Sequence, residues 1–183
     1  SRSVDLLKKR YLENIKEKPD LFVGIELEYP VINLEGKATN SEVVKDLFRY
    51  LPSVLGFTIE KVDDFGNPIQ LLDPVSQDTI LFEVSYTTIE FAFGRAENIQ
   101  EVEERFRDYM DLIQKKLGEA NHAIIGSGIH PYWEKNENQP VAYARYQMLM
   151  NYLKLSRTVL GTDLHDYPQY GAFICGSQVQ LDI

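Results

Sequence analysis

Val23-Gly24-Ile25-Glu26-Leu27-Glu28-Tyr29-Pro30 is the stretch of sequence on which the interpretation of the whole chain depends. Apolar residues alternate in it with Glu26 and Glu28, and a β-strand sends alternate side chains to opposite faces. The stretch therefore predicts a strand with one apolar and one acidic face. With a rise of about 3.3 Å per residue, the two glutamates stand roughly 6.6 to 7 Å apart. This spacing allows two carboxylates to share a set of metal ions.

Two later stretches show the same alternation. Glu90 lies between apolar residues, and in residues 178–183 the polar positions are Gln178, Gln180 and Asp182. If these strands share one sheet, their acidic residues lie on one surface with no lysine or arginine among them. Like charges that face each other across a sheet destabilise it by a few tenths to about 1 kcal/mol. We therefore expect this surface to bind a cation, although a solvated face of an antiparallel sheet is the ordinary alternative.

The rest of the chain alternates between helical and strand periods, which indicates an α+β protein. Four helices are expected, with N-caps where the sequence offers them: residues 3–17 with Ser3 as cap, a helix after Asn40 or Ser41 that ends at Pro52, residues 98–118 with a capping box of Asn98 and Glu101, and residues 143–156. Further strands are expected at residues 57–62 and 69–72, joined by a turn at Gly66 and Asn67, and at residues 79–84 and 122–127.

Glu83 poses a problem of parity. An uninterrupted strand from Glu83 to Glu90 would place the two carboxylates on opposite faces. A turn or bulge at residues 85–87 brings them onto the same face. The four glutamates 26, 28, 83 and 90 then form a ligand set of oxygen atoms only, which favours Mg²⁺ or Mn²⁺ over zinc. Because Mg²⁺ usually completes its coordination with water and substrate phosphates, the set points to a nucleotide.

Composition excludes several classes of function. The 183 residues fit a single domain, and a net charge of −9 argues against a nucleic-acid partner. The one cysteine, Cys175, allows no intrachain disulfide and fits a cytoplasmic protein. No apolar run approaches the roughly 18 residues of a membrane span. Since the sequence stops inside an expected strand, we expect residues 1–183 to be the N-terminal part of a larger catalytic domain.

Two other reactive residues favour structural roles. His130 precedes a proline at the end of a glycine-rich strand, where a histidine is more often a structural hydrogen-bonding residue than a site residue. Cys175 has no basic residue near it in the sequence, so a buried and inert thiol is expected. No glycine-rich phosphate-binding motif occurs.

An ordered set of motifs resembles the glutamate-cysteine ligases, which are carboxylate-amine ligases related to glutamine synthetase. The motifs are residues 24–28, the segment 83–90, Arg145-Tyr146, Asn151-Tyr152 and residues 178–182, and the resemblance runs from about residue 22 to the end. It implies a curved antiparallel sheet shaped as a funnel, with helices on its outer face and several Mg²⁺ ions bound under ATP on its inner face.

The resemblance also implies the roles of individual residues. Glu26, Glu28, Glu83 and Glu90 would be metal ligands, whereas Gln178, Gln180, Arg145 and Tyr146 would contact substrate or ATP. No side chain is assigned as an acid, base or nucleophile.

The implied activity is ATP-dependent ligation of the γ-carboxylate of glutamate to the amine of cysteine, the first step of glutathione biosynthesis. Its partners are glutamate, cysteine, ATP and the C-terminal remainder of the same enzyme, with neither nucleic acid nor membrane. Three alternatives stay open. They are another carboxylate-amine ligase, a glycosidase that uses Glu28 and Glu90 as acid and base, and a metal- or nucleotide-binding fragment without turnover.

Overall fold

A computed structural model describes residues 2–160 and 166–182 of the chain. Their helices and strands follow one another as α1 (Arg2–Leu12), β1 (Val23–Asn33), α2 (Ser41–Leu55), β2 (Thr58–Val62), β3 (Pro68–Leu72), β4 (Thr79–Phe82), β5 (Thr88–Ala92), α3 (Ile99–Gly118), β6 (His122–Ile124), a short 3₁₀ helix (Trp133–Lys135), α4 (Ala144–Leu160), a second 3₁₀ helix (Tyr170–Ala172) and β7 (Ser177–Leu181). The α+β class predicted from the sequence is confirmed.

Strand β1 pairs with three other strands of one antiparallel sheet. Within the described residues the sheet has seven strands in the order β2-β3-β4-β5-β1-β6, and β7 pairs with β1 as well. β5 lies along one edge of β1, and its register places Glu90 opposite Glu28. β7 and β6 pair with the first and the last part of β1 on the other edge, and Gln178 lies opposite Glu26.

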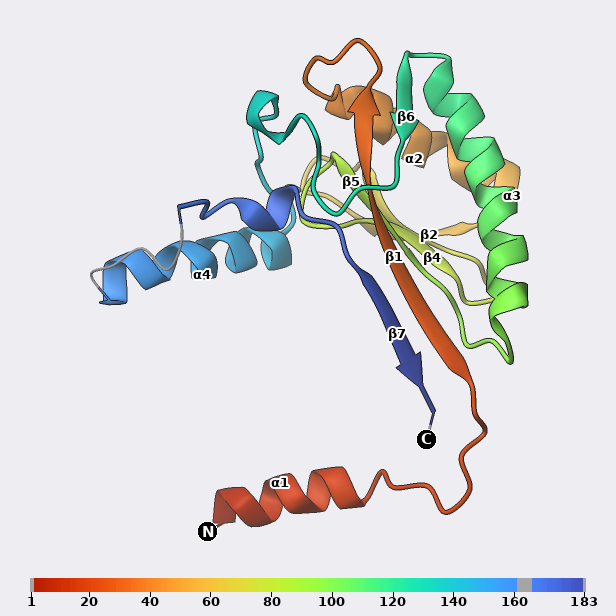
Figure 1. Ribbon diagram of the computed structural model, residues 1–183, viewed down its shortest axis with the longest axis vertical. Helices are drawn as coiled ribbons and strands as arrows, with labels where there is room; N and C mark the ends of the chain where they lie inside the picture. Colours follow the sequence, from red (N-terminus) through yellow and green to blue (C-terminus); the bar gives the residue numbers. More distant parts are fainter. Residues whose placement is uncertain (1, 161–165, 183) are drawn as a thin grey trace.

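The hydrophobic core lies between the sheet and helices α2 and α3. In Figure 1 these two helices cover one side of the curved sheet, whereas α4 lies on the other side. The apolar face of β1 enters the core through Ile25, as the alternation in the sequence predicts. Phe48 of α2 stacks on Phe82 of β4 with 3.9 Å between ring centroids. The face left free by α2 and α3 is the face that carries Glu26 and Glu28.

Two helices begin where the sequence indicates. Asn40 caps α2 by accepting a hydrogen bond from the backbone N–H of Glu42, and Asn98 caps α3 by accepting one from that of Glu101. The prediction that α2 ends at Pro52 is wrong. Pro52 lies in the last turn, where its missing N–H removes only one helical hydrogen bond.

Helix α1 differs most from its prediction. It spans Arg2–Leu12 rather than residues 3–17, so Ser3 is inside the helix and does not cap it. None of its residues is buried, and Figure 1 shows it apart from the rest of the protein. The apolar residues of α1 have helical spacing, but no other part of the described chain buries them.

Smaller differences concern the ends of other elements. The strands expected at residues 79–84 and 122–127 stop at Phe82 and Ile124, and α4 extends beyond residue 156. Ile183, expected in the last strand, lies outside the described residues. No helix in residues 2–160 and 166–182 is both long and apolar enough to cross a membrane.

The fold predicts one sharp sensitivity, at Gly94 between β5 and α3. Its N–H donates to Asp78, and a Cβ built there would lie 1.9 Å from the backbone oxygen of Ser76. Gly94→Ala should therefore lower the free energy of unfolding by about 1 to 3 kcal/mol in chemical denaturation. Gly118→Ala at the end of α3 is the control, because open space surrounds that position. A Gly94→Ala protein as stable as the wild type would show that the close approach of residue 94 to the backbone of Ser76 does not require glycine.

Candidate functional site

Three carboxylates meet on the sheet face that α2 and α3 leave free. Glu28 and Glu90 are cross-strand partners on β1 and β5, and Glu83 directly follows β4. One oxygen atom from each lies within 4.8 Å of the other two. Glu26 lines the same cavity, which has a volume of about 420 Å³. All four side chains are half-buried, so the sheet gathers partly desolvated negative charge at one place.

A tight turn brings Glu83 to this face. The chain reverses at residues 85–87, and the N–H of Glu83 donates to the backbone oxygen of Thr88 at 3.1 Å. Since Leu81 pairs with Glu90, and Glu83 follows Leu81 by two residues, Glu83 and Glu90 share a face. The sequence analysis predicted that a turn or bulge at residues 85–87 brings Glu83 and Glu90 onto the same face, and this prediction is confirmed.

The environment raises the pKa of all three clustered carboxylates. Burial is the largest cause of the raised pKa of Glu90, which reaches about 8, and the hydrogen bond with Glu83 and its negative charge add to it. Burial also raises the pKa of Glu83 and of Glu28. Opposing this at Glu28, the N–H of Gly176 donates to its carboxylate at 2.7 Å. At neutral pH Glu83 and Glu90 therefore hold a proton between them.

Basic residues lie beside the acidic face, and one of them is Arg145, which the family resemblance assigns to substrate or ATP binding. Arg145 at the start of α4 and Lys61 of β2 line the same cavity as the glutamates. The positive charge of Arg145 lowers the pKa of both Glu83 and Glu90 and so opposes part of the effect of burial. Arg145 belongs to a helix on the far side of the cavity, which the alternation within the strands does not reveal.

Of the other predicted contact residues, Tyr146 and Gln178 line the cavity, and Gln180 lies next to it through a hydrogen bond to Glu26 at 3.3 Å. Tyr146 also donates its hydroxyl to the backbone oxygen of Phe82 at 2.7 Å, which fixes the start of α4 against β4.

Asp182 does not join the acidic cluster. It accepts hydrogen bonds from the ammonium of Lys16 at 2.5 Å and from the backbone N–H of Asp20 at 2.8 Å. These contacts lower its pKa, the Lys16 hydrogen bond most of all. Asp182 lies just beyond β7, where the chain that enters β1 passes, so it binds that segment instead of facing the cavity.

His130 and Cys175 have structural surroundings. His130 is fully buried, and its Nε2 atom lies 2.9 Å from the backbone oxygen of Val31 and 3.0 Å from Oγ1 of Thr39. Burial lowers the pKa of this histidine. Burial raises the pKa of the Cys175 thiol to about 12, which keeps it protonated and a poor nucleophile.

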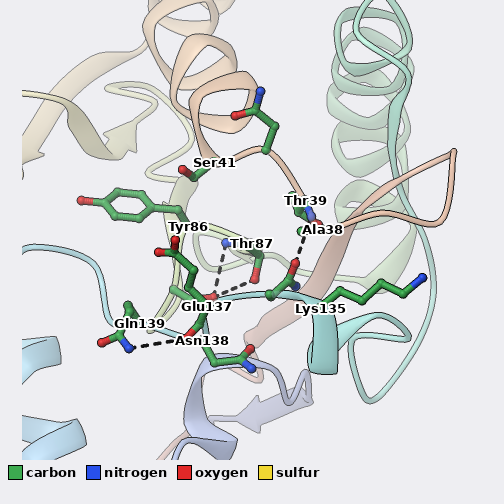
Figure 2. Close-up of a pocket in the computed structure, with 12 residues that line it drawn as sticks. Ala38, Thr39, Ser41, Tyr86, Thr87, Lys135, Glu137, Asn138 and Gln139 are labelled. Atoms are coloured by element: carbon green, nitrogen blue, oxygen red, sulfur yellow. Dashed lines mark hydrogen bonds between the residues drawn. The ribbon is translucent and has the colours of Figure 1, made fainter.

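A second cavity, of about 330 Å³, lies between the start of α2, the turn at residues 85–87 and the loop at residues 135–139. Figure 2 shows Tyr86, Thr87 and Glu137 around it. Asn136 accepts a hydrogen bond from the N–H of Thr39 at 2.9 Å and so ties the loop to the segment that precedes α2. This cavity could not be predicted from the sequence, because its polar residues come from three loops with no shared period.

The acidic cluster has the donor chemistry of a site for a hard divalent cation. Among the described residues, Glu28, Glu83 and Glu90 are the one group of three acidic, histidine or cysteine side chains close enough to ligate a single ion. Mg²⁺ and Mn²⁺ prefer oxygen donors of this kind, and Mg²⁺ uses one or two carboxylates together with water and phosphate. The residues present therefore fit the metal that the sequence implies.

The fold and this cluster together describe an α+β protein with a carboxylate-rich cavity on one face of an antiparallel sheet. A family model described as glutamate-cysteine ligase family 2 (GCS2) matches residues 22–183. The chain belongs to this family, which points to a ligase-type enzyme. A comparison with curated proteins gave no match.

The cluster predicts a metal-dependent gain in stability. Millimolar Mg²⁺ or Mn²⁺ should raise the melting temperature of the wild type. The free energy of unfolding should increase by about 1.4 to 2.7 kcal/mol when the metal concentration is ten to a hundred times the dissociation constant. Glu26→Gln and Glu90→Gln should each raise the melting temperature of the metal-free protein and abolish the metal effect. Glu60→Gln, exposed on β2 and outside the cavity, should behave as the wild type. If both cavity variants still respond to Mg²⁺, the acidic face is an ordinary solvated one.

The raised pKa of Glu90 predicts the pH dependence of the metal-free protein. Between the ordinary value of 4.5 and about 8, folded Glu90 keeps a proton that the unfolded chain has released. The folded state is therefore lost more easily as the pH rises through this window. The melting temperature should fall more steeply from pH 5 to 8 in the wild type than in Glu90→Gln. Parallel curves for the two proteins would contradict this assignment.

Proposed function

We propose that the protein catalyses the ATP- and Mg²⁺-dependent ligation of the γ-carboxylate of glutamate to the amine of cysteine. The observation that carries the proposal is the convergence of Glu28, Glu83 and Glu90 on one sheet face of a chain from this family. Such a ligation proceeds by transfer of the γ-phosphoryl group of ATP to the carboxylate, which gives an acyl phosphate and ADP. The amine then attacks the acyl carbon, loses a proton and displaces inorganic phosphate to form the amide.

The chemistry explains why the site needs both acidic and basic residues. A carboxylate is repelled by a triphosphate, and Mg²⁺ bound at the site supplies the positive charge that offsets this repulsion and stabilises phosphoryl transfer. The roles of the chain's own residues follow from their places around the cavity. The glutamates hold the cation, Arg145 contacts anionic oxygens of ATP, and Gln178 and Gln180 orient the bound substrates by hydrogen bonds.

The protonated pair sets the order of events at the cluster. The proton that Glu83 and Glu90 hold must leave before both can ligate a cation, because a protonated carboxyl donates less charge to a metal. Arg145 favours that loss by lowering both pKa values. Metal affinity should therefore increase with pH.

The glycosidase alternative has less support. A glycosidase needs two carboxyl groups with distinct roles at a separation of about 5 to 9.5 Å. Here a third carboxylate, Glu83, hydrogen-bonds to Glu90 and lies within 4.8 Å of both proposed partners. A set of three close carboxylates suits a cation better than a pair that must work on opposite sides of a sugar.

The test is an ADP-release assay on the full-length protein. We expect ADP release that requires glutamate and Mg²⁺, is stimulated by cysteine and stops with EDTA. Glu28→Gln should lower kcat/KM by about 100-fold or more, since transition-state charge stabilisation is worth about 3 kcal/mol or more at comparable sites. Glu60→Gln is the control.

The outcomes separate the alternatives. If another amine replaces cysteine and cysteine has no effect, the protein is a different carboxylate-amine ligase. Hydrolysis of a glycoside substrate that continues in the presence of EDTA would support the glycosidase. Metal or nucleotide binding without turnover would indicate a binding module.

A further inference from the structure

Lys61 is a cavity residue to which the family resemblance assigns no role. We propose that its ammonium group binds the α-carboxylate of the amino-acid substrate, whose side-chain carboxylate reacts at the acidic cluster. The inference rests on the proposed function and adds a residue that positions the substrate. Four observations carry it: a bulge, a shared row across the sheet, partial burial and an unpaired charge.

A β-bulge turns Lys61 into the cavity. Ile59 pairs with Leu71 of β3, but the next residue of β3, Gln70, pairs with Lys61 and not with Glu60. With a regular register, Glu60 would lie beside Gln70 and Lys61 would point to the opposite face. The bulge thus replaces a negative by a positive side chain at this place. Bulges often re-aim side chains beside active sites.

The pairing extends in one row from Lys61 to the acidic cluster. Gln70 pairs with Leu81 of β4, and Leu81 pairs with Glu90 of β5. Paired residues share a face, so Lys61 and Glu90 lie on the same side of the sheet, three strand spacings or about 14 Å apart at the backbone. Both side chains are long and can lean toward each other. The remaining space suits an amino acid with one carboxylate at each end.

The charge of Lys61 is available to a ligand. No ion pair or hydrogen bond joins its side chain to the rest of the described chain. It is also the one residue of β2 that is half-buried, whereas its four neighbours in the strand are exposed. A lysine whose only role is to prevent an edge strand from pairing with another chain projects into solvent. Lys61 instead lines the cavity with the glutamates.

The position of Lys61 favours a carboxylate over the phosphates of ATP as its partner. The phosphates of ATP bind the same metal ions as the glutamates and therefore lie beside the glutamates of β1 and β5. Lys61 lies on β2, at the other end of the row. A substrate that reacts through its side-chain carboxylate at the cluster presents its α-carboxylate toward that end. An ammonium group binds such a carboxylate through charge-assisted hydrogen bonds.

The experiment measures binding rather than turnover. Glutamate is titrated calorimetrically into the full-length protein with Mg²⁺ and a non-hydrolysable ATP analogue. Lys61→Met should weaken glutamate binding about 10- to 100-fold, as expected for loss of a charged hydrogen bond. Lys61→Arg, which keeps the charge, should restore most of the affinity. Lys115→Met, which removes an exposed charge on α3, should bind as the wild type.

A second ligand identifies the group that Lys61 contacts. 4-Aminobutyrate is glutamate without its α-carboxylate, so Lys61→Met and the wild type should bind it equally. The ATP analogue should also bind equally to both.

Three results would overturn the inference. The first is a Lys61→Met protein that binds glutamate as tightly as the wild type, which would show that Lys61 does not contact the substrate. Loss of ATP-analogue affinity would assign Lys61 to the phosphates. A wild-type protein that binds the ATP analogue but never glutamate would refute the proposed function, and this inference with it.

Discussion

The pairing of Glu28 with Glu90 is the contact on which the site depends. It joins two like charges across neighbouring strands, an arrangement that a sheet tolerates poorly. Its register is held by the other face of β1, where Ile25 enters the core. A slip of one residue would move the glutamates into the core and the apolar residues into the cavity. The free energy of core packing therefore keeps the carboxylates together.

Sequence alone could predict the features that have a local period. The alternation in residues 23–30 predicted β1, and Asn98 with Glu101 predicted the start of α3. The parity of Glu83 and Glu90, together with a turn between them, predicted that the two side chains share a face. These predictions succeed because each depends on residues that are neighbours in the chain or on the two faces of a strand. Metal binding by these residues remains a prediction.

Features that depend on a distant partner could not be predicted in the same way. The charge of Arg145 reaches the cluster from α4, and Lys61 reaches the cavity only because of a bulge in β2. Asp182 follows the polar alternation of its strand but pairs with Lys16, which precedes β1. The apolar residues of α1 have a helical period yet remain exposed. In each case the spacing of apolar and polar residues predicts the local conformation, whereas the role of the side chain depends on the residues that pack beside it in the folded protein.

Binding of a divalent cation by the clustered glutamates can be measured by electron paramagnetic resonance of Mn²⁺. Free Mn²⁺ gives a strong six-line signal that weakens when the ion is bound by protein. We predict that the wild-type protein reduces this signal with a defined stoichiometry, that Mg²⁺ restores it by competition, and that Glu28→Gln largely fails to reduce it. A Mn²⁺ signal unchanged by the wild-type protein, or reduced equally by Glu28→Gln, would show that these glutamates are not the ligands of a divalent cation.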